Sequence, residues 1–269
     1  MLDIYLVQME VAPNDKAKNF AKVRELTAKI HKEPNDPVPG LVILPEMFAT
    51  GYLPASLAEA AEDFSSNASG ETAKMLSELA ETTNCTIMGA GSTCATDGFF
   101  NHVSVYTPGE STEACGYNKM NLFFPEKESF KAGGKINLFT TNHWRIASFI
   151  CYDLRFPEIF REATKLGANL ITIQAAWPAK RRAHWETLLK ARAIENQVYI
   201  AAVNGVTVDK NHPKPLAGTS LIISPNGEVI AEGPATEEAV LSAKLDLQAE
   251  KEYRKSFPVL DGIVPTDLI

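Results

Sequence analysis

Short apolar runs of strand length alternate along this chain with longer stretches in which apolar residues recur at helical spacing. Residues 2–9 and 41–44 are typical of buried strands. Between them, Asn14 is a plausible N-cap for a helix whose apolar face consists of Phe20, Val23, Leu26 and Ile30. This alternation is the feature that most constrains the fold, because strands that alternate with helices indicate an α/β protein.

The remaining elements follow the same pattern. We predict further helices and strands, with helices at residues 72–83, 157–165 and 180–196 and strands at residues 86–89, 102–107, 145–150, 169–175, 198–204, 220–224, 228–231 and 239–245. Turns are predicted at residues 108–110 and 225–227. We find no linker, low-complexity tract or short repeat, so we predict one domain over residues 1–269, with a C-terminal tail from about residue 247.

Charge and composition narrow the classes of function. The 269 residues are 45% hydrophobic, as in ordinary globular proteins, and their net charge is −7. The sequence has no long basic run, so we expect neither a nucleic-acid partner nor an anionic membrane surface. Residues 1–10 do not resemble a signal peptide, and no segment has the roughly eighteen consecutive apolar residues of a membrane helix. We therefore expect a cytoplasmic protein.

The four cysteines give no sign of a metal site. Cys85, Cys94, Cys115 and Cys151 include no C-x-x-C pair and no Cys/His cluster of zinc-finger spacing. A reducing compartment also makes disulfides improbable. We expect no metal and no cofactor, and each thiol has to be judged singly.

Three polar residues follow apolar strands or lie in the loops after them, where α/β folds usually place their chemistry. They are Glu46, Lys119 and Cys151. Taken singly, a cysteine after a strand is more often a small buried hydrophobe than a nucleophile, and a lone glutamate or lysine is most often solvated. Cys151 nevertheless stands between a predicted strand and the helix that Pro157 would begin, which is a common unit for presenting a nucleophile.

The sequences around these three residues resemble the nitrilase superfamily of carbon-nitrogen hydrolases. The matching segments occur in the same order as in the family and span nearly the whole chain: Leu44-Pro45-Glu46, Lys119 with Leu122-Phe123, the run Cys-Tyr-Asp-Leu-Arg-Phe-Pro-Glu at 151–158, Trp177-Pro178, His184-Trp185 and residues 191–197. Three separate motifs in the right order are far more specific than any one of them.

The resemblance implies a fold and an oligomer. It implies a four-layer α-β-β-α sandwich, in which two mixed sheets are flanked by helices. It also implies pairing with a second subunit, so a homodimer or higher homo-oligomer is expected, with the C-terminal tail packed on the partner.

The resemblance further implies a role for each candidate catalytic residue. Glu46 would be the general base, Cys151 the nucleophile that attacks an amide carbon, and Lys119 the group that stabilises the oxyanion. The backbone N–H of Tyr152 would be a second oxyanion donor. The chemistry requires such residues, because a free thiol with a pKa near about 8.5 is only a few per cent thiolate at neutral pH.

A second active-site glutamate is a further feature of the family. Glu126 matches the expected spacing to Gly133, and we therefore favour it. Glu128 lies close enough in sequence to compete. The carboxylate that is not in the site is expected to be a surface charge.

Within the superfamily, the run at 151–158 is most similar to the omega-amidase branch. Its members hydrolyse the terminal amide of short dicarboxylic acid monoamides such as 2-oxoglutaramate and 2-oxosuccinamate. Such a substrate is a small anion, and Arg155, Arg181 and Arg182 are candidates to bind its carboxylate through paired hydrogen bonds. Arg155 can instead pair with Asp153 or Glu158, and the two later arginines can face water. Tyr152 and Trp177 can line the pocket or belong to the core.

The sequence departs from the family pattern in three places, and three other functions compete with an omega-amidase. The departures are Asn121, Ala176 and residues 205–207, all expected near the pocket. One alternative within the superfamily is an amidohydrolase for N-carbamoyl amines or amino acids, or an amidase for a larger amide such as deaminated glutathione. The others are a Cys-His hydrolase that uses His184 and a binding protein that has lost activity.

Overall fold

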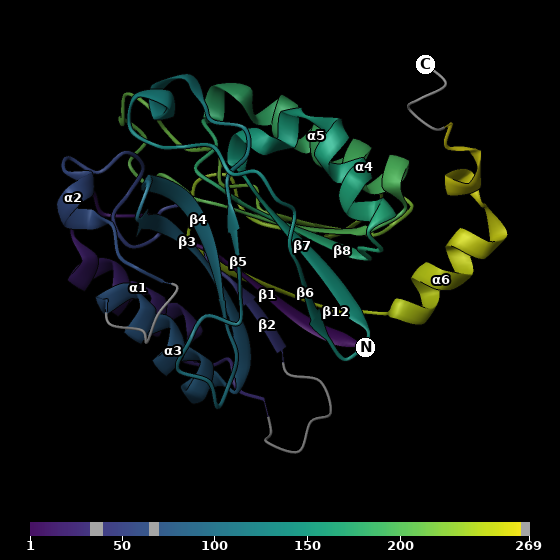
Figure 1. Ribbon diagram of the computed structural model, residues 1–269, viewed down its shortest axis with the longest axis horizontal. Helices are drawn as coiled ribbons and strands as arrows, with labels where there is room; N and C mark the ends of the chain where they lie inside the picture. Colours follow the sequence, from purple (N-terminus) through teal and green to yellow (C-terminus); the bar gives the residue numbers. More distant parts are fainter. Residues whose placement is uncertain (33–39, 65–69, 265–269) are drawn as a thin grey trace.

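Two six-stranded sheets face each other between two layers of helices in the computed structural model (Figure 1). The structure describes residues 1–32, 40–64 and 70–264. Both sheets contain parallel and antiparallel strand pairs, so both are mixed. The predicted α-β-β-α sandwich is therefore confirmed.

The first sheet has the strand order β12-β1-β2-β3-β4-β5. Its three central neighbours β1, β2 and β3 are parallel, and the pairs at both ends are antiparallel. Strands β1 and β12 pair along their full length, with Leu2 opposite Leu245 and Gln8 opposite Ala239. The strands are β1 (Leu2–Gln8), β2 (Gly40–Ile43), β3 (Cys85–Ala95), β4 (Gly98–Tyr106), β5 (Cys115–Asn118) and β12 (Ala239–Leu245).

The second sheet has the order β11-β10-β9-β8-β7-β6. Strands β7, β8 and β9 are parallel to one another, which is the arrangement expected when crossover helices connect successive strands. The strands are β6 (Leu138–Thr141), β7 (Trp144–Ile150), β8 (Leu170–Ala175), β9 (Tyr199–Asn204), β10 (Leu221–Ile223) and β11 (Val229–Glu232).

Helices α1 and α3 cover the outer face of the first sheet, and α4 and α5 cover the second (Figure 1). Helix α6 extends away from this body at the C-terminal end of the chain. The helices are α1 (Lys16–Thr27), α2 (Leu57–Ala60), α3 (Glu71–Thr83), α4 (Pro157–Lys165), α5 (Arg182–Asn196) and α6 (Leu247–Ser256). None of the helices in the described ranges has the length and apolar character that a bilayer-spanning segment requires.

Local sequence explains where several helices begin and end. Helix α4 has Pro157 in its first turn, as predicted. Helix α3 buries one apolar face against the first sheet and ends at Asn84, which adopts the left-handed conformation with φ of 50°. Asparagine tolerates this conformation better than most residues, so it suits a helix end.

The structure corrects the predicted N-cap of the first helix. Asn14 is not the cap; the side chain of Asp15 accepts a hydrogen bond from the Lys18 N–H (3.0 Å) instead. Asn14 lies one residue earlier with φ of 54°, and its side chain accepts from the N–H of Ala55. Both residue types are good caps, and the sequence alone does not distinguish neighbours that each satisfy the rule.

Other differences concern element boundaries. Strands β5 and β6 were not predicted, because each has only four residues and lies at a sheet edge. The predicted helix at 180–196 begins as a single 3₁₀ turn, Ala179–Arg181, which leads into α5. The predicted strands at 86–89 and 102–107 extend to Cys85–Ala95 and Gly98–Tyr106, which pair along their full length.

Candidate active site

The three polar residues singled out in the sequence come from both sheets and lie just beyond strand ends. Glu46 follows β2, Lys119 follows β5, and Cys151 follows β7. Cys151 begins a 3₁₀ turn, Cys151–Arg155, that continues into α4. Its φ of 46° places a non-glycine residue in the left-handed region, which is typical of a nucleophile held on a sharp turn between strand and helix.

Lys119 forms the centre of a buried ionic cluster. Its ammonium lies 2.9 Å from Glu46 Oε1, and 2.9 and 2.8 Å from Glu126 Oε1 and Oε2. All three side chains are fully excluded from solvent. Such a group is stable only when charges are paired and hydrogen-bonded, so the cluster is held by mutual contacts rather than by water.

Two further donors complete the hydrogen bonding of Glu46. The side-chain amide of Asn101 donates to Glu46 Oε1 (2.8 Å) and to Glu126 Oε1 (2.9 Å), so it links the two carboxylates. The backbone N–H of Ala176 donates to Glu46 Oε2 (2.9 Å). Within the described part of the chain, Oε2 has this single donor, whereas Oε1 has two. Oε2 therefore keeps a lone pair that can accept a proton.

The charges of this cluster influence the protonation states of Lys119 and Cys151. Burial alone would lower the pKa of the Lys119 ammonium, but the Glu46 and Glu126 carboxylates raise it above its usual value. Burial raises the pKa of the Cys151 thiol well above the usual range; Glu46 adds to the rise, and Lys119 opposes it. Lys119 is therefore charged and Cys151 is a neutral thiol at neutral pH.

The structure separates the two competing glutamates. Glu126 is completely buried, and its Oε2 also accepts a hydrogen bond from the N–H of Phe123 (2.7 Å). Burial raises its pKa, while Lys119 opposes the rise. Glu128, two residues on, is exposed at the end of the 3₁₀ turn Phe124–Glu128.

Arg155 lies near the cysteine at the end of the same turn and is half-buried. Its guanidinium carbon lies 4.6 Å from the ring centroid of Trp177 and 5.8 Å from that of Tyr152. No carboxylate of the described residues lies within 4.0 Å of it, so neither Asp153 nor Glu158 is its ionic partner. Burial and the nearby Arg181 lower the pKa of its guanidinium. An incompletely hydrated cation without an acid partner is suited to binding an anion.

The remaining predicted site residues have other contacts. Tyr152 is half-buried in an aromatic group with Phe123, Phe124 and Phe156. Trp177 is buried, and its indole N–H donates to the carbonyl of Arg181 (2.9 Å). The guanidinium of Arg182 donates to the carbonyl of Ala217 (3.1 Å). Of these residues, Tyr152 and Trp177 therefore lie against Arg155, whereas Arg182 has a backbone partner.

His184 is exposed, and its Nδ1 lies 3.4 Å from the Arg155 guanidinium. Across the described ranges, no histidine is hydrogen-bonded to Cys151. This geometry gives no support to a Cys-His pair.

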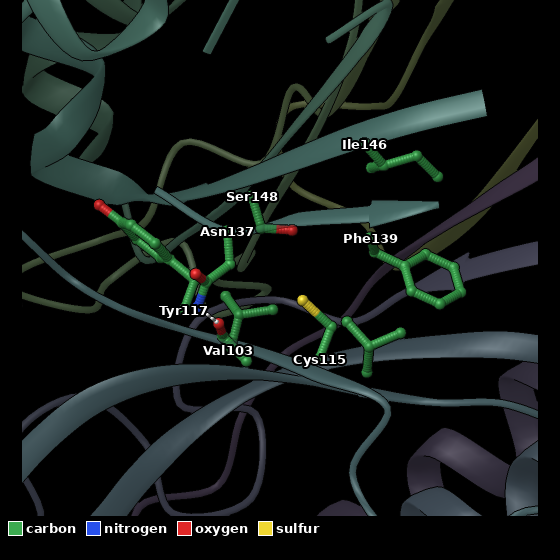
Figure 2. Close-up of a pocket in the computed structure, with 9 residues that line it drawn as sticks. Val103, Cys115, Tyr117, Asn137, Phe139, Ile146 and Ser148 are labelled. Carbon is green, nitrogen blue, oxygen red and sulfur yellow. Dashed lines mark hydrogen bonds between the residues drawn. The ribbon is translucent and has the colours of Figure 1, made fainter. Parts of the chain in front are cut away.

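The other thiols lie elsewhere. Cys115 lies between strands of the two sheets and lines a cavity together with residues such as Val103, Phe139 and Ser148 (Figure 2). The volume of this cavity is about 10 Å³. This space is about the size of one water molecule. Burial raises the pKa values of Cys115 and Cys85. The charges that act on these two thiols do not include those of Glu46, Lys119 or Glu126, so neither thiol lies at the proposed site.

Sequence reasoning missed Asn101, and it named Asn121 only as a departure from the family pattern. Asn101 faces the cluster from the middle of β4, where a strand pattern gives no reason to single out an asparagine. Asn121 donates from both its N–H and its side chain to the buried Asp153. No cluster of three or more metal-ligating side chains is found among the described residues.

Comparison with known sequences gives a consistent group of relatives. Residues 4–255 match the model of the carbon-nitrogen hydrolase family. The chain is 34% identical over 263 residues to the 2-oxoglutaramate amidase of Bacillus subtilis, covering 97% of this chain and 96% of that protein. It is 35% identical over 222 residues to omega-amidase YafV of Escherichia coli K12, covering 81% and 82%.

A solved structure also resembles this fold over almost its whole length. XC1258 from Xanthomonas campestris, described as a CN-hydrolase superfamily protein with an arsenic adduct in its active site, superposes with a TM-score of 0.87. The two chains are 32% identical, and the match covers 98% of each.

Proposed function

Because the chain belongs to the carbon-nitrogen hydrolase family, we propose that it hydrolyses the terminal carboxamide of small dicarboxylic acid monoamides, as an omega-amidase. The family makes it a hydrolase of carbon–nitrogen bonds other than peptide bonds. The names of its relatives from Bacillus subtilis and Escherichia coli support the choice of an omega-amidase. The proposed substrates are 2-oxoglutaramate and 2-oxosuccinamate, which are converted to the dicarboxylate and ammonia.

In the proposed acylation step, Cys151 attacks the carboxamide carbon while its proton passes to Glu46. The thiol is neutral, so attack requires a base in contact with it, and the free lone pair on Glu46 Oε2 suits this role. Lys119 and the backbone N–H of Tyr152 would stabilise the oxyanion. Glu46 then returns the proton to the nitrogen, the carbon–nitrogen bond breaks, and ammonia leaves behind a thioester.

The proposed deacylation step uses the same groups with water. Glu46 takes a proton from a water molecule, whose oxygen attacks the thioester carbon. The carbon–sulfur bond then breaks, and the thiol recovers its proton from Glu46. In our proposal, Glu126 keeps the Lys119 ammonium in place, because it is the only other carboxylate among the described residues within 4.0 Å of that ammonium.

The surroundings of Arg155 are the observation that supports an anionic substrate. Arg155 lacks an acid partner among the described residues, it is half-buried, and it lies four residues after the proposed nucleophile in the sequence. We propose that it binds the distal carboxylate of the substrate, with Trp177 supporting its guanidinium and Tyr152 beside it. Arg181 is the second candidate, because its charge acts on Arg155 and it therefore lies near the same place.

The test compares charged and uncharged amides. Arg155→Ala should raise KM for 2-oxoglutaramate by about tenfold or more while sparing an uncharged amide of equal length, because one charge-assisted hydrogen-bonding partner is lost. Arg24→Ala, which removes a surface arginine paired with Glu78, is the matched control and should change neither KM. A larger effect from Arg181→Ala would assign the carboxylate to Arg181. Equal loss on both amides would contradict the role given to Arg155.

The N-carbamoyl alternative and the larger-amide alternative are not favoured by the relatives. A carbamoylase would release carbon dioxide together with ammonia, so the product separates the two reactions. Release of ammonia and a dicarboxylate alone supports the omega-amidase.

We also propose that the chain acts as one domain whose C-terminal tail packs on a second subunit. Helix α6 extends from the body (Figure 1). The segment after it exposes large apolar side chains. Phe257 is 58% and Val264 is 54% exposed. Light scattering should report a dimer that Phe257→Asp weakens, and a wild-type monomer would contradict this.

We further propose a cytoplasmic location. The four free thiols are consistent with this proposal.

A further inference from the structure

The carboxylate of Asp153 joins the two segments that carry Cys151 and Lys119. It is completely buried, and its oxygens accept four hydrogen bonds. Oδ2 accepts from the N–H of Ile150 (3.0 Å) and the hydroxyl of Tyr117 (2.8 Å). Oδ1 accepts from the N–H (2.8 Å) and the side-chain amide (3.0 Å) of Asn121.

On the cysteine side, the bond from Ile150 closes the turn around Cys151. Ile150 precedes the cysteine and Asp153 follows two residues after it, so the hydrogen bond spans the residue with φ of 46°. A non-glycine residue keeps this backbone conformation only when its surroundings enforce it. The Asp153 carboxylate is one such restraint.

On the lysine side, the Asp153 carboxylate fixes the two residues after Lys119, Met120 and Asn121. The Tyr117 hydroxyl accepts from the N–H of Met120 (3.1 Å) and donates to Asp153. Asn121 binds Asp153 directly. The hydroxyl remains a donor throughout the accessible pH range, because burial and the Asp153 charge raise the pKa of Tyr117. Asp153 thus holds the loop that presents the ammonium.

We propose that Asp153 is a positioning residue that fixes Cys151 relative to Lys119 and Glu46. Its hydrogen bonds go to Ile150, Tyr117 and Asn121 and not to Glu46, Lys119 or Cys151, so it acts through the two backbone segments. The reaction that it serves rests on the proposed function, but the position of the thiol does not. In such a site, a displacement of about 1 Å can cost about a hundredfold in rate.

The proposed role does not rest on the charge of Asp153 acting on the Cys151 thiol. The charges that act most strongly on the Cys151 thiol are those of Glu46, Lys119 and Glu126. Since the thiol is neutral at neutral pH, its reaction depends on proton transfer to the proposed base, Glu46. A shift of the turn should therefore slow the reaction of the Cys151 thiol even where the protein remains folded.

The test uses Asp153→Asn, which keeps the shape and replaces one acceptor with a donor. At least two of the four hydrogen bonds are lost, because the new amide group faces N–H or O–H donors. Glu62→Gln is the matched control. Glu62 is also a mostly buried carboxylate with several donors, namely Lys16 and the first turn of α3, and it lies outside the Lys119 cluster.

Two measurements are made on the full-length variants. With 2-oxoglutaramate, Asp153→Asn should lower kcat by at least about tenfold and leave KM within about twofold, because no substrate contact is lost. With iodoacetamide at neutral pH, followed by mass spectrometry, the alkylation of Cys151 should slow by about tenfold. Glu62→Gln should leave both rates unchanged, even if the two variants unfold at the same reduced temperature.

A second variant keeps the proposal testable if Asp153→Asn does not fold. Asn121→Ala removes one of the four hydrogen bonds from a half-buried side chain and should give a smaller change in the same direction. Wild-type kcat and alkylation rate in both variants would overturn the proposal, as would equal losses in Glu62→Gln. The alkylation result stands even if the wild type does not hydrolyse 2-oxoglutaramate, so the two proposals fail separately.

Discussion

The ammonium of Lys119 lies 2.9 Å from Glu46 Oε1, and both side chains are fully excluded from solvent. The Glu46 and Glu126 carboxylates help to keep the ammonium charged, and Glu126 and Asn101 complete the contacts. A pair of this kind is not a strong source of stability, because the desolvation of two ions offsets most of their attraction. Its persistence in the core is better explained by the reaction that we propose.

Lys119→Ala should lower both activity and stability. Loss of one oxyanion donor costs about a hundredfold or more in kcat. Two buried carboxylates also lose their cation, so the free energy of unfolding should fall by about 3–5 kcal/mol. Adding Glu126→Gln should recover part of the stability but none of the activity. Recovery of activity in the double variant, measured with thermal unfolding alongside, would show that Lys119 has only a structural role.

Glu46→Gln should shift the pH dependence of thiol alkylation to lower pH. The Glu46 carboxylate raises the pKa of Cys151, so its removal lowers that pKa and the thiolate forms at lower pH. Loss of the base separately slows the reaction of the neutral thiol at neutral pH, so the midpoint of the pH dependence is the readout here. Lys119→Met should shift the dependence in the opposite direction, because Lys119 lowers the same pKa. Rates of iodoacetamide reaction from pH 6 to 10 check both signs. If the midpoint of the pH dependence were unchanged in both variants, the charges of Glu46 and Lys119 would not act on Cys151.

Asn101→Ala should impair the reaction although Asn101 is not assigned a chemical step. Its amide group donates to both Glu46 and Glu126, and hydrogen bonds to charged groups are worth about 1.5–3 kcal/mol each. We expect kcat to fall by about tenfold or more, together with a lower unfolding temperature. Ser104→Ala, which changes a buried polar residue of the same strand, is the control. Equal kcat in these two variants would argue against the bridging role.

Chelating agents should leave the activity unchanged. The proposed mechanism uses only water and side chains, and the described residues contain no cluster of three or more metal-ligating groups. Prolonged dialysis against EDTA, followed by the ammonia assay, checks this expectation. Loss of activity that added zinc restores would contradict the metal-free mechanism.

The sequence predicted those parts of the site that follow predominantly apolar strands. Glu46 and Cys151 stand directly beyond the runs that become β2 and β7, and the alternation of elements made their positions interpretable. Lys119 was found through its neighbouring residues rather than through a strand, because β5 has only four residues and includes a glycine and an asparagine. Weak edge strands of this kind carry little periodic signal.

Contacts between distant segments were beyond the reach of the sequence. Asn101 joins two carboxylates that lie 55 and 25 positions away, and no local pattern records such a partnership. Spacing also left Glu126 and Glu128 open, because a tight 3₁₀ turn decides which of them faces inward. The departure at Asn121 has a physical explanation in the structure, since its amide group binds Asp153.

The most direct test of the central claim is ammonia release from 2-oxoglutaramate by the wild type and by Cys151→Ala, measured side by side. The substitution removes the nucleophile from a half-buried position and leaves Glu46, Lys119 and Glu126 in place. We predict rapid release by the wild type and only background release by the variant. Equal release by both proteins would mean that Cys151 is not the nucleophile, and the proposed mechanism would be wrong.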